Sequence, residues 1–341
     1  MSEQRIGVVG AGTMGQGIAQ VVAASGFNVR LYDVADEQLT RAKNAIDKGL
    51  EKLVAKEKMS EEGKQEALAR LSTTTALDAL SDCSVIIEAA PEQPALKEKL
   101  FRDLSHLSSD AILASNTSSL SLTRLAAVCE RPERVVGMHF FNPVPVLKLV
   151  EVIRAEQTSD ATVERIEALT KALGKTAVPV GDAPGFAVNR LLVPMINEAA
   201  FIVQEGTATP EAIDEAMKLG AAHPMGPLAL ADLIGLDVNY AVTCQIWESY
   251  QRHPRFAPSE LQKKLVDSGR LGRKSGQGFF EYGENLEKPA VNNAEETSAP
   301  DSVVLEGPEY LPESLRKLFD ESSLTLQSTS GKGYIRLPEG T

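Results

Sequence analysis

The sequence predicts a doubly wound, parallel α/β domain followed by an all-helical domain. Three observations lead to this fold class. Short apolar runs alternate with helix-like segments along the first half of the chain, and a glycine-rich turn joins the first run to the first helix. Near Ala183 the pattern then changes to nearly continuous helix, which extends to about Gly269. Strand–helix alternation of this kind is typical of parallel sheets covered by helices.

The expected strands are short runs of aliphatic residues. The first is Arg5–Val9, and the helix that follows it ends before Gly26. The other expected strands are 28–33, 84–90, 111–116, 134–140, 147–153 and 176–180. From Asp36 to about Leu71 the chain is rich in Ala, Leu, Lys and Glu, which predicts a long helix broken near 58–63.

These patterns divide the chain into four parts. Residues 1–183 form the sheet domain and 184–283 the helical domain. The polar, proline-bearing stretch 284–302 is expected to be a linker. Residues 303–341 regain strand–helix–strand character and are expected to form part of a small α/β module.

Composition limits the classes of function. Of the 341 residues 43% are hydrophobic and 24% charged, which is ordinary for a globular protein. The net charge of −12 argues against nucleic acid as a partner. No apolar run is long enough to predict a membrane span, and the first residues carry no targeting pattern. Three scattered cysteines favour reduced thiols, so we expect a cytoplasmic protein, and no Cys or His cluster has metal-ligand spacing.

The glycine-rich turn matches G-x-G-x-x-G between the first strand and the first helix. Its residues are Gly10, Ala11, Gly12, Thr13, Met14 and Gly15. In such a turn the glycines allow a tight bend, backbone approach to a pyrophosphate and helix–strand packing. Asp33 ends the next strand, where an acid accepts hydrogen bonds from a ribose 2′-OH and repels a 2′-phosphate. The pattern predicts a Rossmann-type domain that binds NAD in preference to NADP.

Ligands of open α/β sheets lie beyond the carboxyl ends of the strands. At those ends the chain has 88–92, 115–119 and 139–142. Hydroxyl and amide residues there are also common in plain turns and helix caps. A lone histidine such as His139 is by default structural or exposed, and the sequence alone gives His106, His223 and His253 no acidic partner.

Six motifs in order resemble the L-3-hydroxyacyl-CoA dehydrogenases over about residues 5–283. They are GAGTMGQGIA, EAAPE with Lys97, SNTSSL, HFFNPVPVLKLVEV, DAPGFAVNRLL and HPMGPLALADLIGLD. The resemblance implies reversible, NAD-dependent oxidation of an L-3-hydroxyacyl-CoA to the 3-ketoacyl-CoA. It also implies a homodimer formed through the helical domain.

The resemblance also assigns roles to single residues. His139 is implied as the catalytic base and acid, and Glu151 as the carboxylate that holds its imidazole. A group that titrates near neutrality suits removal of the hydroxyl proton, and a carboxylate on the other ring nitrogen fixes the tautomer. Ser118 and Asn189 are implied to bind the substrate near the reacting oxygen.

Further positions are implied around the cofactor and the CoA tail. Asn116 and Asn142 would lie near the nicotinamide and the reacting centre, and Glu92, Lys97 and Lys274 would contact the cofactor. For the last three, a merely exposed charge is the alternative. Lys48, Lys52 and Lys56 share one helix face, for which solvent exposure is the default, and Lys56 alone is expected to bind substrate.

The sequence is also compatible with two other functions. The chain could be a dehydrogenase of the same fold that oxidises a free hydroxy acid or sugar acid, or a non-catalytic NAD-binding protein. The tail beyond 283 resembles the start of an extra module in longer bacterial members of the family, so we expect a shortened long form. That likeness favours 3-hydroxybutyryl-CoA or 3-hydroxyadipyl-CoA as substrate, but no motif encodes acyl-chain length.

Overall fold

A computed structural model describes residues 5–108 and 110–283, together with the backbone of three strands near the C-terminus. The chain forms two compact units, Met1–Leu286 and Glu287–Thr341. Among the described residues no helix is long and apolar enough to cross a membrane.

The first unit is built on an eight-stranded sheet in the order β3-β2-β1-β4-β5-β6-β7-β8. The strands are β1 (Arg5–Val9), β2 (Asn28–Tyr32), β3 (Leu71–Thr74), β4 (Val85–Glu88), β5 (Ile112–Ser115), β6 (Val135–Phe140), β7 (Leu149–Arg154) and β8 (Thr176–Gly181). The predicted doubly wound sheet is confirmed, but it is mostly rather than wholly parallel. β7 runs antiparallel to β6, and β8 runs parallel to β7.

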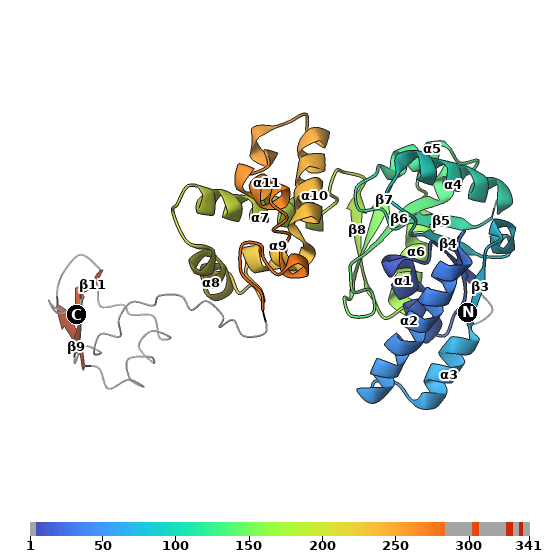
Figure 1. Cartoon of the computed structure of the whole chain (residues 1–341), viewed down its shortest axis with the longest axis horizontal. Coiled ribbons are helices and arrows are strands. Elements are labelled where there is room, and N and C mark those ends of the chain that lie inside the picture. Colours follow the sequence, from blue (N-terminus) through green and yellow to red (C-terminus); the bar gives the residue numbers. More distant parts are fainter. Residues whose placement is uncertain (1–4, 109, 284–301, 307–324, 330–333, 337–341) are drawn as a thin grey trace. The chain divides into compact units, whose positions relative to one another are not determined.

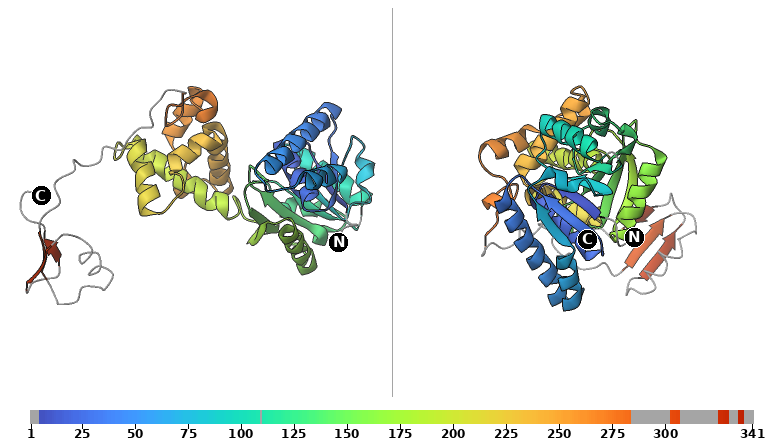
Figure 2. Two further views of the ribbon diagram at one scale, coloured as in Figure 1. Left: turned by 90° about the horizontal axis from the view of Figure 1, so that it is seen from below. Right: turned by 90° about the vertical axis from the view of Figure 1, so that its right-hand side faces the viewer.

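One predicted boundary is wrong. The helix expected to reach Leu71 ends earlier, and the chain continues as the edge strand β3, which pairs with β2. The helical part divides into α2 (Asp36–Ala55) and α3 (Glu61–Ala69), broken where predicted. Ser60 caps α3 by accepting a hydrogen bond from the Gly63 N–H. The two helices lie side by side as an arm that projects from the sheet (Figures 1 and 2).

Helices cover both faces of the sheet (Figure 1). The remaining helices of this domain are α1 (Thr13–Ala24), α4 (Pro94–Leu107), α5 (Leu122–Ala127) and α6 (Asp160–Ala172). Side chains alternate between the two faces along a strand. Val8 therefore joins the core under α1, α2 and α6, whereas Val9 joins the core under α4 and α5.

The same alternation fixes the direction of the two central polar residues of β6 and β7. Met138 and Phe140 enter the first core, so His139 between them points to the other face. Val152 likewise enters the first core, and Glu151 points the same way as His139. His139 and Glu151 are register partners across the antiparallel pair.

The helical domain consists of α7 (Val188–Gln204), α8 (Pro210–Gly220), α9 (Pro227–Ile234), α10 (Leu236–Ser249) and α11 (Glu260–Asp267). Two buried carboxylates stabilise the start of α9 and the segment 279–282 by hydrogen bonds. Asp214 accepts hydrogen bonds from the first N–H groups of α9, and Asp232 accepts them from the Phe279 and Phe280 N–H groups and the Tyr282 hydroxyl. Burial raises the pKa of both carboxyls. The domain is therefore fixed by polar anchors as well as by its apolar core.

The second unit contains a three-stranded sheet in the order β10-β9-β11. Its strands are β9 (Ser302–Glu306), β10 (Thr325–Thr329) and β11 (Tyr334–Arg336), with β10 parallel and β11 antiparallel to β9. The linker expected at 284–302 lies outside the described residues except for Ser302, as does the helix expected between the tail strands.

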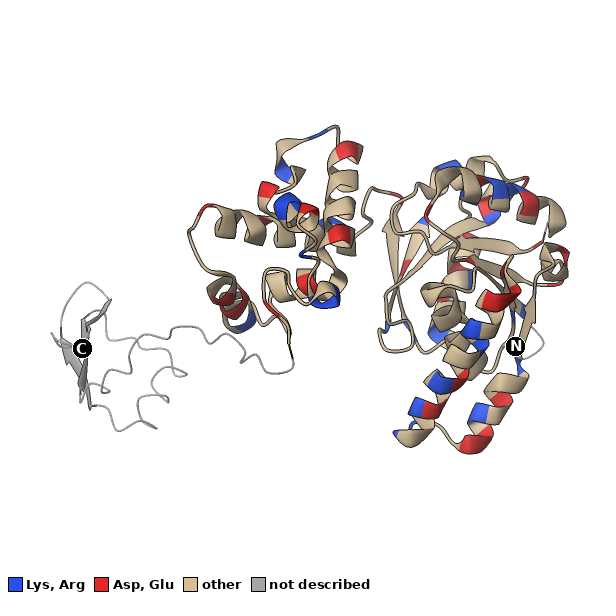
Figure 3. Ribbon diagram, in the orientation of Figure 1, with Lys and Arg blue, Asp and Glu red and all other residues tan. Residues whose placement is uncertain are grey.

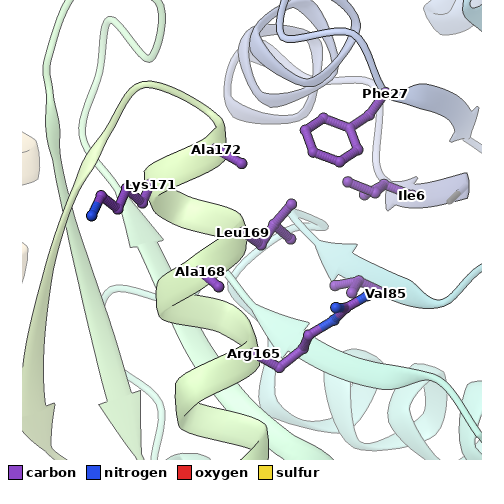
Figure 4. Close-up of a pocket in the computed structure, with 8 residues that line it drawn as sticks. All are labelled: Ile6, Phe27, Val85, Arg165, Ala168, Leu169, Lys171 and Ala172. Atoms are coloured by element: carbon purple, nitrogen blue, oxygen red, sulfur yellow. The ribbon is translucent and has the colours of Figure 1, made fainter. Parts of the chain in front are cut away.

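A cavity of about 270 Å³ lies at the amino ends of the strands (Figure 4). Ile6 of β1, Val85 of β4 and Leu169 of α6 line it, together with Arg165 of α6. This position is opposite the strand ends where doubly wound sheets bind their ligands. The cavity is therefore separate from the candidate site described next.

Candidate functional site

The glycine-rich turn lies at the junction of β1 and β4, where the strand order reverses. Gly10 has a φ of +99°, and a Cβ there would meet the Ala89 carbonyl oxygen at 2.7 Å. A Cβ at Gly15 would meet the Gly10 carbonyl oxygen at 1.7 Å. These two glycines are therefore required by the fold itself.

Gly12 differs, because a Cβ there would meet no protein atom within 4 Å. Gly12 and Thr13 are exposed at the start of α1, and no side chain caps this helix. The space above Gly12 and the N–H groups of the first turn can accommodate a pyrophosphate, whose charge the helix N-terminus favours. Asp33 stands beside this turn and accepts hydrogen bonds from the Ala11 and Ala35 N–H groups at 2.8 and 3.0 Å. The residues present thus fit a dinucleotide.

A buried ion pair lies at the carboxyl end of β4. Lys97 of α4 is 1% exposed, and its Nζ lies 2.5 Å from Oε1 of Glu88. The same Nζ also donates to the Ala90 carbonyl at 3.1 Å and lies 3.2 Å from Oε2 of Glu92. Glu88 in turn accepts hydrogen bonds from the Ala90 N–H and the Ser115 hydroxyl. The contact of Lys97 with a cofactor remains a prediction, and the groups around its Nζ in this structure are those of Glu88, Ala90 and Glu92.

Glu92 connects this pair to the loop after β5. Its Oε1 accepts hydrogen bonds from the Thr117 hydroxyl, the Ser118 N–H and the Ser119 hydroxyl. Burial raises the pKa of the Glu92 carboxyl, but the charge of Lys97 and the hydroxyl donors outweigh it, so the pKa lies below its ordinary value. Glu92 is therefore ionised at neutral pH and fixes the loop that carries Ser118.

The loop after β5 carries two of the predicted residues, Asn116 and Ser118. The Asn116 Oδ1 accepts a hydrogen bond from the Phe140 N–H, the residue after His139. Among the described residues the Asn116 amide nitrogen has no acceptor, so it can donate to a ligand. Ser118 lines a small recess with Pro184, Gly185 and Ile246. The loop thus connects the strand bearing His139 with the beginning of the helical domain.

His139 and Glu151 form the predicted pair. Nδ1 of His139 lies 2.7 Å from Oε2 of Glu151. The side chains are 8% and 1% exposed, and the rings of Phe141 and Phe186 lie 4.5 and 5.7 Å from the imidazole. With Nδ1 held by the carboxylate, Nε2 is the ring nitrogen left for a ligand.

The other oxygen of Glu151 caps the first helix of the helical domain. Its Oε1 accepts hydrogen bonds from the Ala187 and Val188 N–H groups, both at 2.9 Å. Val188 is the first residue of α7, and Asn189 follows it. Burial raises the pKa of the Glu151 carboxyl, but the hydrogen bonds from His139 and the two N–H groups outweigh it, so the pKa is lowered. One carboxylate therefore orients the imidazole and the helix that carries Asn189.

The structure does not bring every predicted residue into this cluster. The side chains of Asn142 and Lys56 are exposed and make no hydrogen bond among the described residues. Lys48, Lys52 and Lys56 all lie exposed on or next to α2, where basic and acidic residues are mixed along the arm (Figure 3). Lys274 pairs with Asp237 of α10 within the helical domain.

Other features were missed by the sequence predictions. Lys175 is buried, and its Nζ donates to the carbonyls of Val144 and Leu147 in the turn between β6 and β7. Burial lowers its pKa. No pattern in the sequence around Lys175 predicts that it is buried or that it holds this turn. His106, expected to have no acidic partner, pairs with Glu130 on the surface.

Comparisons with known proteins match both parts of the first unit. Residues 5–183 match the family model described as 3-hydroxyacyl-CoA dehydrogenase, NAD binding domain, and 185–282 match 3-hydroxyacyl-CoA dehydrogenase, C-terminal domain.

Individual relatives carry related names. A probable 3-hydroxybutyryl-CoA dehydrogenase of Bacillus subtilis is 48% identical over 83% of this chain and 99% of that protein. A 3-hydroxyadipyl-CoA dehydrogenase of Escherichia coli is 44% identical over 86% of this chain and 62% of that protein. The crystal structure of a 3-hydroxybutyryl-CoA dehydrogenase from Escherichia coli matches 99% of this chain and 75% of that one, with 38% identity and a TM-score of 0.84.

Proposed function

Because this chain belongs to the 3-hydroxyacyl-CoA dehydrogenase family, we propose that His139 and Glu151 perform the proton transfer of an NAD-dependent oxidation of a 3-hydroxyacyl-CoA. The observation that carries this proposal is the 2.7 Å contact between His139 Nδ1 and Glu151. It leaves Nε2 as the only ring nitrogen that can exchange a proton with substrate.

The residues act in the following way. His139 Nε2 accepts the proton of the 3-hydroxyl group, and the Glu151 carboxylate stabilises the imidazolium that forms. Ser118 and Asn189 hydrogen-bond the 3-oxygen and the thioester region. In the reverse direction the imidazolium returns its proton to the ketone oxygen, so the pair serves both directions. The buried surroundings of the pair strengthen these interactions by excluding water.

The sheet domain is proposed to bind most of the cofactor. When bound, NAD supplies the acceptor for the hydride that leaves C3. The turn from Gly10 to Gly15 and the start of α1 would hold its pyrophosphate, and Asp33 its adenosine ribose. Asn116 and Asn142 are assigned to the nicotinamide side, and Glu92 and Lys97 to further contacts with the cofactor. Lys274 reaches the cofactor from the helical domain if its pair with Asp237 opens.

The substrate is proposed to be 3-hydroxybutyryl-CoA, with 3-hydroxyadipyl-CoA as the second candidate. The name of the Bacillus subtilis relative supports the first and that of the Escherichia coli relative the second. Lys56 is assigned to the CoA tail because it is exposed and has no ion-pair partner among the described residues. A cationic side chain there suits the phosphates of CoA.

We also propose a cytoplasmic homodimer. Leu191 of α7, Leu219 of α8 and Val238 of α10 are 72%, 78% and 49% exposed. Large exposed aliphatic side chains on one domain favour association through that domain. The three cysteines are unpaired, which suits a reducing compartment.

The test is NADH consumption by the purified protein with acetoacetyl-CoA and, in parallel, with free acetoacetate. We expect turnover of the CoA ester alone. In the His139→Gln variant kcat should fall by about 10²–10⁴-fold, the range of general acid–base catalysis, with NADH affinity unchanged. Equal turnover of both compounds would favour a free-acid dehydrogenase. A variant as active as wild type would remove His139 from the mechanism.

A further inference from the structure

We propose that Lys175 is a positioning residue, which holds the turn between β6 and β7 so that Asn142 stays beside the nicotinamide. This turn comprises residues 141–148 and follows the strand that bears His139. The inference rests on the NAD-dependent function proposed above, in which Asn142 lies on the nicotinamide side. It adds a residue that acts through the turn and not on the reacting atoms.

The backbone places Lys175 beside this turn. Gly174, with a φ of +68°, follows the end of α6 and leads the chain into β8. Thr176, the first residue of β8, donates its N–H to the Lys148 carbonyl at 2.8 Å. The lysine side chain therefore starts next to the last residue of the turn.

The ammonium group of Lys175 binds two carbonyl groups of the turn. Its Nζ donates to the Val144 carbonyl and, at 2.7 Å, to the Leu147 carbonyl. These carbonyls accept from no other group among the described residues. Lys175 is 9% exposed and has no carboxylate partner in the described part of the chain. Its burial is therefore accounted for by the turn, whose buried carbonyl groups need donors.

The turn also packs against the helix that begins at the glycine-rich motif. Val144 is 2% exposed and belongs to the core under α1. A Cβ at Gly17 of α1 would lie 3.0 Å from the Val144 Cβ and 3.6 Å from the Pro145 Cδ. Helix and turn are thus too close for an added side chain unless the turn moves. Lys175 and α1 together fix the position of the turn.

Asn142 depends on this support, because no protein group binds its side chain. The side chain is exposed and has no hydrogen bond among the described residues. The backbone that follows it is folded by hydrogen bonds from the Val146 and Leu147 N–H groups to the Pro143 carbonyl, at 2.9 and 3.0 Å. Without the ammonium group, this folded segment should shift and take Asn142 with it. His139 should stay in place, since its own carboxylate partner lies outside the turn.

Binding of NADH and of ADP-ribose tests the proposal. Both ligands carry the adenosine and the pyrophosphate, but only NADH carries a nicotinamide. In Lys175→Met, isothermal titration calorimetry should show NADH affinity lowered by roughly 10-fold, as expected for a lost hydrogen bond near the nicotinamide. ADP-ribose affinity should be unchanged. An equal loss for both ligands would overturn the proposal, since it would indicate general damage to the binding domain.

A double-mutant cycle identifies the group through which Lys175 acts. Lys175→Met, Asn142→Ala and the double variant are compared by kcat for acetoacetyl-CoA reduction at saturating NADH. Each single change should lower kcat by roughly 10-fold, as expected when a group near the reacting centre is lost or misplaced. The double variant should be little worse, and KM for acetoacetyl-CoA should be unchanged in all three. Losses that multiply, or an Asn142→Ala protein as active as wild type, would overturn the proposal.

Two further variants complete the test. Lys171→Met removes an exposed lysine of α6 that has no ion pair among the described residues, and it should match wild type in every measurement. If Lys175→Met does not fold, Gly17→Ala displaces the turn from the side of α1 and leaves the ammonium group in place. It should weaken NADH binding and leave ADP-ribose binding unchanged. A Gly17→Ala protein that bound both ligands as wild type does would contradict the role of the turn.

The two binding measurements do not depend on turnover. A wild-type protein that bound NADH but reduced no acetoacetyl-CoA would therefore overturn the dehydrogenase function, and the comparison of NADH with ADP-ribose would still test Lys175.

Discussion

Glu151 satisfies two groups with one carboxylate. Oε2 meets the His139 imidazole, and Oε1 meets the first N–H groups of α7. Both sets of bonds favour the ionised form, which explains why the pKa of this carboxyl is lowered although burial opposes it. The chemistry of the site and the start of the helical domain are therefore linked at one residue.

This linkage predicts a specific response to acid. A carboxyl whose pKa is lowered in the folded state contributes stability above its unfolded pKa of about 4.3 and loses it as pH falls through the folded value. The unfolding free energy of wild type should therefore fall on acidification below about pH 4.3. Glu151→Gln should be less stable at neutral pH and should show a shallower fall. Denaturant unfolding between acidic and neutral pH measures both.

The matched control is Glu62→Gln, since the Glu62 side chain is exposed at the start of α3 and has no hydrogen bond or ion pair among the described residues. It should reproduce the wild-type slope. If Glu151→Gln did the same, Glu151 would not be the linked group.

Asp33 gives the second prediction for a single residue. Its carboxylate is held by the Ala11 and Ala35 N–H groups, next to the glycine turn. Asp33→Asn keeps an acceptor for one N–H group but removes the charge that repels a 2′-phosphate. The ratio of kcat/KM for NADPH to that for NADH should rise by roughly 10-fold, equivalent to ~1.4 kcal/mol. An unchanged ratio would exclude Asp33 as the selector of NAD.

Among the structural elements, the turn from β1 into α1 allows the binding and folding roles of glycine to be separated. Gly12→Ala should unfold like wild type, because its Cβ meets nothing in the protein, yet it should weaken NADH binding by occupying the space for the pyrophosphate. Gly15→Ala should be strongly destabilised, because its Cβ would overlap the Gly10 carbonyl. Thermal unfolding and NADH titration of the two variants test this contrast. A Gly12→Ala protein with wild-type affinity would contradict it.

The strands show which parts of the fold the sequence could predict. Apolar runs such as 85–88 identify buried strands directly. β3 was missed because Leu-Ser-Thr-Thr is a short, partly exposed edge strand without an aliphatic run. The antiparallel direction of β7 could have been predicted, since the eight residues between β6 and β7 are too few for a parallel crossover.

The candidate site was predictable to a similar degree. The contact of His139 with Glu151 follows from two strands joined by a short turn. Neither the cap that Glu151 places on α7 nor the burial of Lys97 could be predicted, because both depend on how distant elements pack. Sequence patterns thus identify residues of the site more readily than their partners.

For the molecule as a whole, the division into two units is the feature that can be tested. His139, Glu151, the glycine turn and both family matches lie in Met1–Leu286. A compact unit with its own core folds independently. We therefore expect a chain ending at Leu286 to retain kcat and both KM values within about 2-fold. Steady-state kinetics of the shortened protein check this, and a loss of activity would assign a role to Glu287–Thr341.

The β6–β7 hairpin determines how this acid–base pair can be inherited. His139 and Glu151 belong to one contiguous stretch of the gene, so recombination can transfer them together. Insertions in the turn at 141–148 leave the pairing intact, whereas one extra residue within either strand would rotate its member of the pair to the opposite face of the sheet. For this pair, insertions and deletions are therefore tolerated at the tip of the hairpin but not within its two strands. A designer who grafts this chemistry onto another sheet would need to copy the strand register before any side chain.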